Sequence, residues 1–386
     1  MDALAERLSE GLAALDRESL RRRRRVLDSP QGSRARIDGR ELVNFSSNDY
    51  LGLAADARLV QAAHRALDEY GVGSGASPLV SGHLRPHEEA ERRFAAFSGL
   101  PRALLFASGY AANLGILTVL AGPDAEVFGD RLNHACLHDG ARLSRATYTR
   151  YAHLDMDELA RALEASRAPV RIVATDAVFS MDGDVAPLPR LLELCERHDA
   201  WLVIDDAHGI GVLGGRGRGT LEHFGIGSPR IVYMATLGKA LGGYGAFVAG
   251  AAQTVEWLLQ RARTYIFSTA LPPMLAAASS AALGLVESDP SILARLRSRI
   301  AEFRAACAAL GVPVSPSQTA IQPVIVGSAE RALEVSARLL ELGLLVPAIR
   351  PPTVPRGTSR LRASLSAAHE RADVERLAHA LAACLA

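Results

Sequence analysis

The sequence predicts an α/β protein with a large, mostly parallel β-sheet, helices on both faces of that sheet, and a small α+β region at the C-terminal end. Short apolar runs alternate with segments of helical periodicity between residues 103 and 250. This alternation is typical of buried parallel strands joined by helices. The composition then changes after Leu271-Pro272-Pro273 to Ala- and Arg-rich helical segments and a few further short strands.

The bulk composition fits a globular protein with a substantial core. The chain has 386 residues, of which 49% are hydrophobic, enough for two domains. We expect an N-terminal helical segment and strand over residues 1–45, a large domain over 46–280 and a small domain over 281–386. The 43 basic and 42 acidic residues nearly cancel, so no general charge favours a nucleic acid or a membrane as partner.

Cysteine usage and hydropathy indicate the compartment. The four cysteines contain no CxxC pair, which predicts reduced thiols rather than a disulfide framework or a metal site. We find no signal-peptide core and no apolar stretch of about 18 residues that could span a membrane. A cytoplasmic protein is therefore expected.

The N-terminal 25 residues show leucines at helical spacing and predict a helix over residues 2–25. This helix is expected to end in the run Arg21-Arg22-Arg23-Arg24-Arg25. One interpretation is a solvated basic face; the other is that one of these arginines receives an anionic group of a substrate. Nucleic-acid binding is disfavoured, because no aromatic residues interleave with the arginines.

The next segment predicts a strand over residues 41–46, a polar turn over 47–52 and an amphipathic helix over 57–70 that stops at Gly71. Residues 71–78 are rich in glycine and serine. Such a stretch suits a loop that passes close to a ligand or another subunit, and it also suits plain flexibility. A further helix is expected to begin near His87.

The large domain contains a series of predicted strands: residues 103–106, 126–129, 171–175, 201–204, 231–234 and 246–250. Ligands of open parallel sheets bind at the carboxyl ends of the strands. Polar residues lie at or just past several of these ends: His134, Ser180, Asp205, His208 and Lys239. A single histidine in such a place is more often structural, but five such residues together predict a functional site.

Lys239 is the only lysine in the chain, and every other member of the 43 basic residues is an arginine. Arginine can carry positive charge almost anywhere that lysine can, but it does not lose a proton and cannot form an imine. A lone lysine therefore suggests a task that needs a neutral, nucleophilic amine. The alternative is that the composition drifted toward arginine and left one lysine by accident. The residues around Lys239 distinguish a functional lysine from such an accident.

Residues 209–214 match the pattern GxGxxG after a predicted strand. A dinucleotide site would need the glycines directly after the strand, a following helix and an acidic residue about 20 positions further on. Residues 205–208 intervene instead, and another glycine-rich segment follows. A nicotinamide or flavin site is therefore disfavoured.

The residues fit what pyridoxal phosphate (PLP) requires. This cofactor needs a lysine for its aldehyde, a carboxylate for its ring nitrogen, hydrogen-bond donors for its phosphate and a flat partner for its ring. Lys239, Asp205, the turn Ser108-Gly109-Tyr110 and His134 supply these groups in turn. His208 lies three residues after Asp205 and can face the same ring, as can Ser180, and Thr236 can support the region near the lysine.

Four motifs resemble the α-oxoamine synthase family of fold type I PLP enzymes, and the resemblance covers nearly the whole chain. The motifs are residues 46–52, 178–184, 205–209 and 236–240. The resemblance implies PLP as cofactor and a homodimer with shared active sites. It also implies that the loop over 71–77 and Ser268-Thr269 are contributed by the neighbouring subunit.

Residues 348–355 and 360–362 most resemble the family member that joins L-alanine to a pimeloyl thioester, carried on CoA or acyl carrier protein, with release of CO2, in biotin biosynthesis. The resemblance implies that Lys239 holds the cofactor and removes the Cα proton. Further implied roles follow: His134 stacks on the ring and moves a proton, Asn48 and Arg362 bind the amino-acid carboxylate, and Arg21 and Thr353 contact the acyl thioester. The alternative within the family is a member that uses glycine.

Two other classes remain open at this point. The first is a binding or regulatory protein on the same fold that has lost catalysis, although every cofactor position carries the expected residue type. The second is a dinucleotide oxidoreductase, which rests only on the glycine pattern at 209–214.

Overall fold

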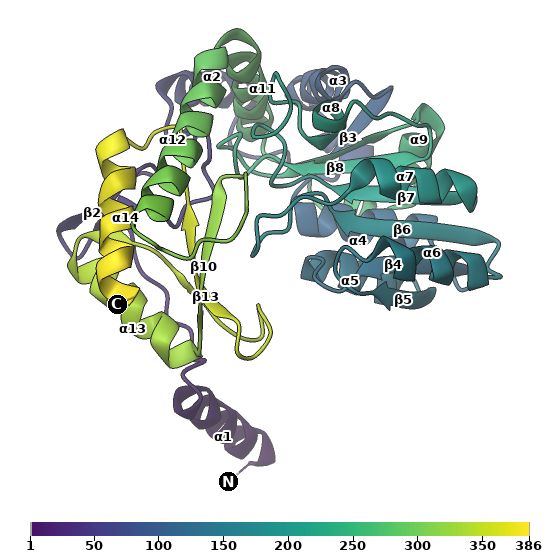
Figure 1. The fold of residues 1–386 in the computed structure, drawn as a ribbon. Coiled ribbons are helices and arrows are strands. Elements are labelled where there is room, and N and C mark those ends of the chain that lie inside the picture. The colour runs from purple at the N-terminus through teal and green to yellow at the C-terminus, as the bar shows by residue number, and fades with distance from the viewer. Residues whose placement is uncertain (1, 386) are drawn as a thin grey trace. The chain divides into compact units, whose positions relative to one another are not determined.

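The computed structural model describes residues 2–385, and its largest feature is a seven-stranded β-sheet (Figure 1). Strand β9 runs opposite to the other six strands of this sheet, which all point the same way. The structure thus confirms the predicted mostly parallel α/β fold. In spatial order the strands are β3 (Arg102–Phe106), β9 (Ala246–Gly250), β8 (Ile231–Thr236), β7 (Ala200–Asp205), β6 (Val170–Asp176), β4 (Ala125–Asp130) and β5 (Thr147–Tyr151).

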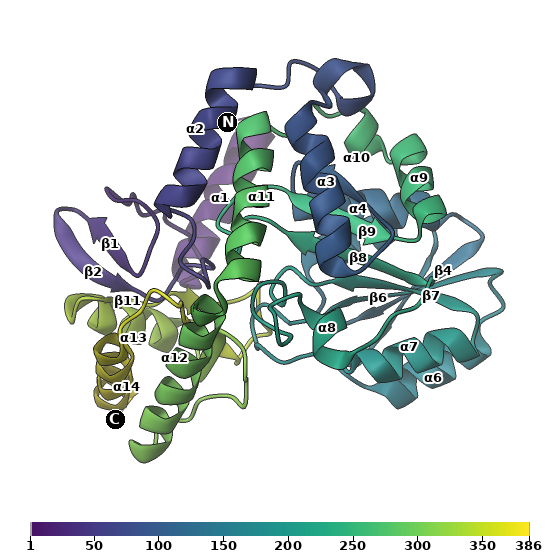
Figure 2. The ribbon, with the colours of Figure 1, turned by 90° about the horizontal axis from the view of Figure 1, so that it is seen from above.

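Helices cover both faces of this sheet, with α6 and α7 on one side and α4 and α9 on the other (Figure 2). The inner strands β8 and β9 are therefore apolar along nearly their whole length, as strands buried on both faces are. The helices of this part of the chain are α2 (Ala57–Tyr70), α3 (Arg85–Ser98), α4 (Gly109–Leu120), α5 (Ala135–Leu143), α6 (Met156–Ala165), α7 (Leu188–Arg197), α8 (Thr220–Phe224), α9 (Ala252–Arg261), α10 (Arg263–Ile266) and α11 (Pro273–Ser288), with a π-turn over Pro78–Gly82.

The core of this region lies between the sheet and the helices α4, α5 and α9. Val127, Ile172 and Val232 from three strands pack there with Ile116 and Leu117 of α4, and all five are fully buried. Each fully buried aliphatic side chain contributes roughly 1.5–3 kcal/mol relative to an exposed one. This packing fixes the carboxyl ends of the strands relative to one another.

The chain divides into two compact units. The larger holds the seven-stranded sheet and consists of residues 49–180 and 184–294. The smaller consists of residues 1–48, 181–183 and 295–386. The N-terminal segment and the C-terminal region therefore share one unit, to which the short segment 181–183 also belongs.

The smaller unit contains two three-stranded sheets and several helices. One sheet has the order β1-β2-β11 and the other has the order β10-β13-β12. The bounds are α1 (Ala3–Arg17), β1 (Arg34–Ile37), β2 (Arg40–Asn44), β10 (Ile321–Gly327), α13 (Ala329–Glu341), β11 (Leu344–Leu345), β12 (Ala348–Ile349), β13 (Ser359–Ser364) and α14 (Arg371–Leu385), and α12 (Pro290–Ala309) spans the division at residue 295.

The N-terminal helix is shorter than the sequence predicts, and the prediction of a helix over residues 2–25 is wrong at its C-terminal end. Helix α1 ends at Arg17, and Ser19 has a φ of 55°, outside the helical range. The arginine run at 21–25 is therefore not helical. Five adjacent arginines would place like charges four residues apart on a helix, which is unfavourable.

Strands β1 and β5 were not predicted. Strand β5 was missed because its residues are polar and mostly exposed or half-buried at the edge of the sheet. In the C-terminal region β11 and β12 are separate short strands, and Pro347 between them has no N–H for a sheet ladder. By contrast, α2 spans residues 57–70 and ends at Gly71, as predicted.

None of the helices between residues 2 and 385 combines the length and the apolar character that crossing a membrane would require.

The glycine-rich segment after β7 is a packed loop. Asp206 is fully buried and its carboxylate accepts hydrogen bonds from the Thr220 N–H (2.8 Å) and the Tyr233 hydroxyl (2.7 Å). A Cβ atom at Gly209 would overlap this carboxylate, and one at Gly219 would do the same. These glycines are thus required by close packing against Asp206.

Replacing Gly209 by Ala should destabilise the protein by about 1–3 kcal/mol, because the added methyl group overpacks a buried, hydrogen-bonded carboxylate. The thermal unfolding midpoint measures this loss. Gly215→Ala is the matched control in the same loop, since the nearest atom to its added Cβ is Glu222 Oε1 at 3.9 Å. Equal unfolding midpoints for the two variants would contradict the assigned packing role.

Candidate active site

Lys239 lies at the carboxyl edge of the large sheet, three residues beyond the end of β8. Its Nζ atom is 2.8 Å from His208 Nε2, and His208 Nδ1 is 2.7 Å from the Tyr50 hydroxyl. His208 follows β7, which pairs in parallel with β8. One ring of His208 thus connects the Lys239 amine to the Tyr50 hydroxyl.

Asp205 is the last residue of β7 and is buried. Its Oδ2 accepts a hydrogen bond from Asn113 Nδ2 at 2.7 Å, and its Oδ1 accepts one from the Ala207 N–H at 3.0 Å. Asn113 lies on the buried face of α4. Both carboxylate oxygens are therefore oriented by donors, which holds the group as an acceptor at the strand end.

His134 lies at the N-terminus of α5, after β4. Its backbone N–H donates to Asp176 Oδ2 (3.0 Å) at the end of β6, and its Nδ1 is 2.8 Å from Cys136 Sγ. Burial lowers the pKa of His134 below its ordinary value, although the Asp205 carboxylate opposes this change. Burial, together with the nearby Asp205, raises the pKa of Asp176 well above its usual range.

The turn after β3 opens helix α4. Ser108 caps this helix, and its Oγ accepts from the Ala111 N–H at 3.1 Å. A Cβ atom at Gly109 would lie 2.7 Å from Thr236 Cγ2, so the turn packs directly on the end of β8. The Tyr110 side chain is exposed and its hydroxyl donates to Asp139 Oδ2 at 2.6 Å.

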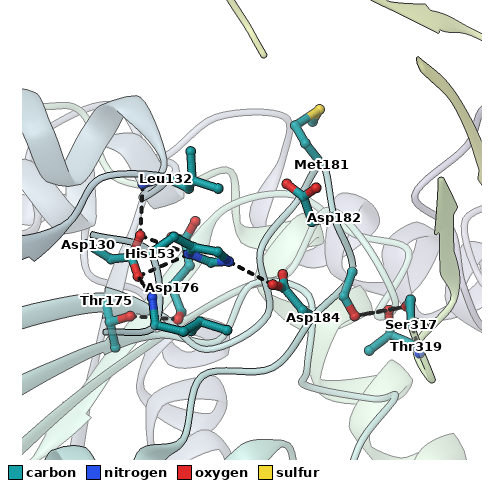
Figure 3. A network of polar contacts seen from close by, with 12 residues as sticks. Asp130, Leu132, His153, Thr175, Asp176, Met181, Asp182, Asp184, Ser317 and Thr319 are labelled. Atoms are coloured by element: carbon teal, nitrogen blue, oxygen red, sulfur yellow. Dashed lines mark hydrogen bonds and ion pairs between the residues drawn. The ribbon is translucent and has the colours of Figure 1, made fainter. Parts of the chain in front are cut away.

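Ser180 lies in a turn after β6 that is held at its other end by His153. The His153 ring lies between Asp130 and Asp184, with Nδ1 3.0 Å from Asp130 Oδ1 and Nε2 2.7 Å from Asp184 Oδ2 (Figure 3). Burial alone would lower the pKa of His153, but the hydrogen bonds to the two carboxylates outweigh it and raise the pKa to about 10. His153 is therefore a cation that both acids share.

Residues 181–183, in the middle of this turn, belong to the smaller unit. There the Gly183 carbonyl accepts hydrogen bonds from the hydroxyls of Ser317 (2.8 Å) and Thr319 (3.2 Å), and Arg360 forms an ion pair with Asp182. Figure 3 shows Ser317 and Thr319 side by side at this position.

The smaller unit contains four of the five predicted substrate residues, and the fifth, His134, lies in the larger unit. Arg362 Nη1 donates to Asn48 Oδ1 at 3.1 Å, so the structure brings this pair together. Arg21 pairs instead with Asp16 at 2.6 Å, and it is Arg22 that donates to Thr353 Oγ1, at 3.1 Å. All of Arg21, Arg22 and Thr353 line one open hollow of about 710 Å³.

The residues of the larger unit fit the cofactor that the sequence predicts. Thr236 Oγ1 is buried and has no hydrogen-bond partner among residues 2–385, which is costly unless a ligand supplies one. It lies beside the Ser108-Gly109 turn, where the N-terminus of α4 suits a phosphate group. Lys239, Asp205 and His134 have the amine, the carboxylate and the flat ring that this cofactor requires.

Sequence reasoning missed Tyr50, Asn113 and Cys136. Tyr50 and Asn113 stood inside recognised segments, but their partners lie 158 and 92 residues away in the sequence. No local pattern reveals such contacts. Cys136 had the best available signal, since it lies two residues after His134 at a helix start.

Comparison with known proteins gives a consistent result. The family described as aminotransferase class I and II matches residues 40–381. A protein of Methylobacillus flagellatus named 8-amino-7-oxononanoate synthase is 56% identical over 97% of this chain and 94% of its own length. A protein of the same name from Herminiimonas arsenicoxydans is 54% identical over 98% and 99% of the two chains.

Solved structures agree on the fold. Serine palmitoyltransferase from S. paucimobilis, with bound PLP and myriocin, has a TM-score of 0.93 at 28% identity and covers 100% of this chain and 98% of its own. The 8-amino-7-oxononanoate synthase of Francisella tularensis has a TM-score of 0.77 at 31% identity, over 89% and 97% of the two chains.

Replacing His153 by Asn should destabilise the protein in a pH-dependent manner. The pKa of His153 is raised from about 6.5 when unfolded to about 10 when folded, so its stabilisation is fully present below pH 6.5 and is lost as the pH rises through 10. We expect a loss of about 3 kcal/mol at pH 6 and a much smaller one at pH 10.5.

Thermal unfolding midpoints of the variant and the wild type across this pH range test the expectation. His64→Asn, at an exposed position of α2, is the matched control and should leave the pH profile unchanged. A loss that stays constant from pH 6 to pH 10.5 would show that the charge of His153 does not contribute.

Proposed function

The chain belongs to the class I and II aminotransferase family, and we propose that it catalyses the condensation of L-alanine with a pimeloyl thioester, with loss of CO2 and release of the free thiol. This is the reaction that the name 8-amino-7-oxononanoate synthase, carried by its relatives at 51–56% identity, denotes. The observation that carries the proposal is the position of the single lysine, beside His208 and at the strand edge that holds Asp205.

PLP is the cofactor, and it supplies an electron sink for the negative charge that develops at the substrate Cα. Lys239 is the residue that attaches it. The same amine, once free, accepts the proton from the Cα of alanine. His208 Nε2 lies 2.8 Å from Nζ and holds the amine in place.

Asp205 keeps the ring nitrogen of the cofactor protonated. Its two oxygens are oriented by Asn113 and by the Ala207 N–H, so the carboxylate needs little reorganisation to accept a further hydrogen bond. The Ser108-Gly109 turn and the unpartnered Thr236 hydroxyl bind the phosphate end, and Ser180 and His208 complete the cofactor contacts. His134 covers the ring face.

Substrate groups are assigned to the smaller unit. Arg362, hydrogen-bonded to Asn48, binds the amino-acid carboxylate, since a guanidinium can donate two parallel hydrogen bonds to it. Arg21 and Thr353 contact the acyl thioester. The hydrogen bond between Arg22 and Thr353 supports a share for Arg22 in this role. Either CoA or acyl carrier protein can serve as the carrier.

A homodimer with shared active sites is part of the proposal. The loop over residues 71–77 is tied to the segment near Ser268-Thr269: Ser74 Oγ donates to the Leu271 carbonyl (2.7 Å) and the Ala270 N–H donates to the Ala76 carbonyl (3.0 Å). The two segments therefore form one surface that a neighbouring subunit's site can use. The cytoplasm is the proposed compartment, and the four cysteines, which are all buried and unpaired, suit it.

The second candidate is another member of the same group that uses glycine, such as 2-amino-3-ketobutyrate CoA ligase or 5-aminolevulinate synthase. The chemistry of Lys239 and Asp205 would be the same, and only the substrate residues would act differently. The high identity to the relatives over nearly their whole length places this candidate second.

Lys239→Ala and Lys239→Arg should both remove the visible absorbance of the bound cofactor and lower turnover by several orders of magnitude, because neither side chain offers a titratable amine. Absorption spectra with and without L-alanine, and a thiol-release assay, measure the two effects. Arg371→Lys exchanges one basic residue for another at an exposed position of α14. As the control, it should leave the absorbance and the turnover unchanged. Turnover by Lys239→Arg at the wild-type rate would overturn the assignment.

A thiol-release assay over a grid of substrates tests the proposed reaction itself. L-alanine, glycine and L-serine are each combined with pimeloyl-CoA, pimeloyl-acyl carrier protein, acetyl-CoA and succinyl-CoA. We expect the highest kcat/KM for L-alanine with a pimeloyl thioester. Higher values for glycine with acetyl-CoA or succinyl-CoA would favour the second candidate instead.

A further inference from the structure

Cys136 is a buried thiol that the proposed reaction does not use, and it contacts the side chain of His134 directly. Its Sγ atom is 2.8 Å from His134 Nδ1 and 3.1 Å from Asn113 Nδ2. Asn113 in turn contacts Asp205. Four side chains thus form one continuous network from the carboxylate at the end of β7 to the imidazole at the start of α5.

The direction of each hydrogen bond in this network follows from the chemistry of its two ends. A carboxylate only accepts, so the Asn113 amide nitrogen faces Asp205 Oδ2, at 2.7 Å. The opposite orientation of the amide would set two oxygens against each other. The same Nδ2 donates to Cys136 Sγ, which makes the sulfur an acceptor on this side.

The other end is fixed by a backbone group. The Cys136 N–H lies 3.3 Å from His134 Nδ1. A backbone N–H can only donate, so Nδ1 is an acceptor and carries no proton. The contact between Sγ and Nδ1 is then a hydrogen bond from the thiol S–H to the imidazole nitrogen. Burial raises the pKa of the Cys136 thiol, which keeps that proton on sulfur.

We propose that Cys136 is a positioning residue that holds His134 as the neutral imidazole with its proton on Nε2. This inference rests on the proposed function, in which His134 covers the cofactor ring. With Nδ1 occupied, Nε2–H is the only polar group that His134 can offer to a substrate. His134 then acts as a hydrogen-bond donor to a substrate oxygen rather than as the resting base.

The charged groups around His134 are compatible with this form. Burial disfavours the imidazolium, and the Lys239 amine acts in the same direction, whereas Asp205 and Asp139 favour the charged form. Asp176 binds the His134 backbone N–H and not the ring. Among residues 2–385, no carboxylate forms a hydrogen bond with the imidazole of His134. A thiol can fix the tautomer of the imidazole without stabilising its charged form, whereas a carboxylate would stabilise that form.

The test is the tautomer of His134, measured by NMR on ¹⁵N-histidine-labelled protein without added substrate, with His134→Asn used to assign the signals. Wild type should show an unprotonated Nδ1 and a protonated Nε2. Cys136→Ser should keep this pattern, because a hydroxyl can donate in the same place. Cys136→Ala should show a mixture of tautomers and a raised pKa for His134.

A steady-state arm separates positioning from packing. Cys136→Ala should lower kcat by about three- to tenfold, the effect of one lost hydrogen bond, with a smaller change in KM, and Cys136→Ser should restore most of it. Cys195→Ala removes a buried thiol that donates a hydrogen bond to the Trp201 carbonyl, at 3.8 Å, and should leave both the His134 signals and kcat unchanged.

Two results would overturn the inference: a proton on Nδ1 in the wild type, or the same tautomer and pKa in Cys136→Ala as in the wild type. Both are read from the protein itself. Failure of the substrate grid would instead overturn the proposed function and leave the tautomer result standing.

Discussion

The contact between Lys239 Nζ and His208 Nε2 is the interaction on which the proposed chemistry depends. It exists because β7 and β8 are parallel neighbours whose carboxyl ends reach the same edge of the sheet, with Asp205 paired to Met234. A parallel sheet buried on both faces fixes these ends by packing rather than by the loops themselves. The amine, the imidazole and the carboxylate can therefore be held close together on short, rigid connections.

This edge also concentrates buried charge. Asp205, Asp176 and Asp130 lie at the ends of neighbouring parallel strands, where uncompensated carboxylates would be costly. The structure compensates each carboxylate differently. Asp130 forms an ion pair with His153, and Asp205 accepts a hydrogen bond from Asn113. Burial raises the pKa of Asp176 well above its usual range. Of the three, Asp205 is the carboxylate that we assign to the ring nitrogen of the cofactor, because Asn113 and the Ala207 N–H orient its two oxygens.

Much of the fold and of the site could be predicted from the sequence. Hydrophobic periodicity, the ends of apolar strands and the chemistry of single residues can all be read from local sequence. The strands predicted over residues 201–204 and 231–234 are examples, and the structure has them over Ala200–Asp205 and Ile231–Thr236. Local patterns failed where the deciding contact is distant or electrostatic. The contact of Tyr50 with His208, for example, joins residues far apart in the chain. Helix α1 ends at Arg17, where Ser19 adopts a positive φ, and Arg22 rather than Arg21 contacts Thr353.

The two units use basic residues differently, and this difference bears on why the chain has a single lysine. Carboxylate recognition in the smaller unit is carried by arginines, as in the pairs of Arg360 with Asp182 and Arg34 with Asp373, and a guanidinium is the better group for it. Only the step that needs a removable proton requires an amine, and it is assigned to the larger unit. On the proposed function, Lys239 is the position where an exchange of lysine for arginine would preserve the charge and abolish the chemistry.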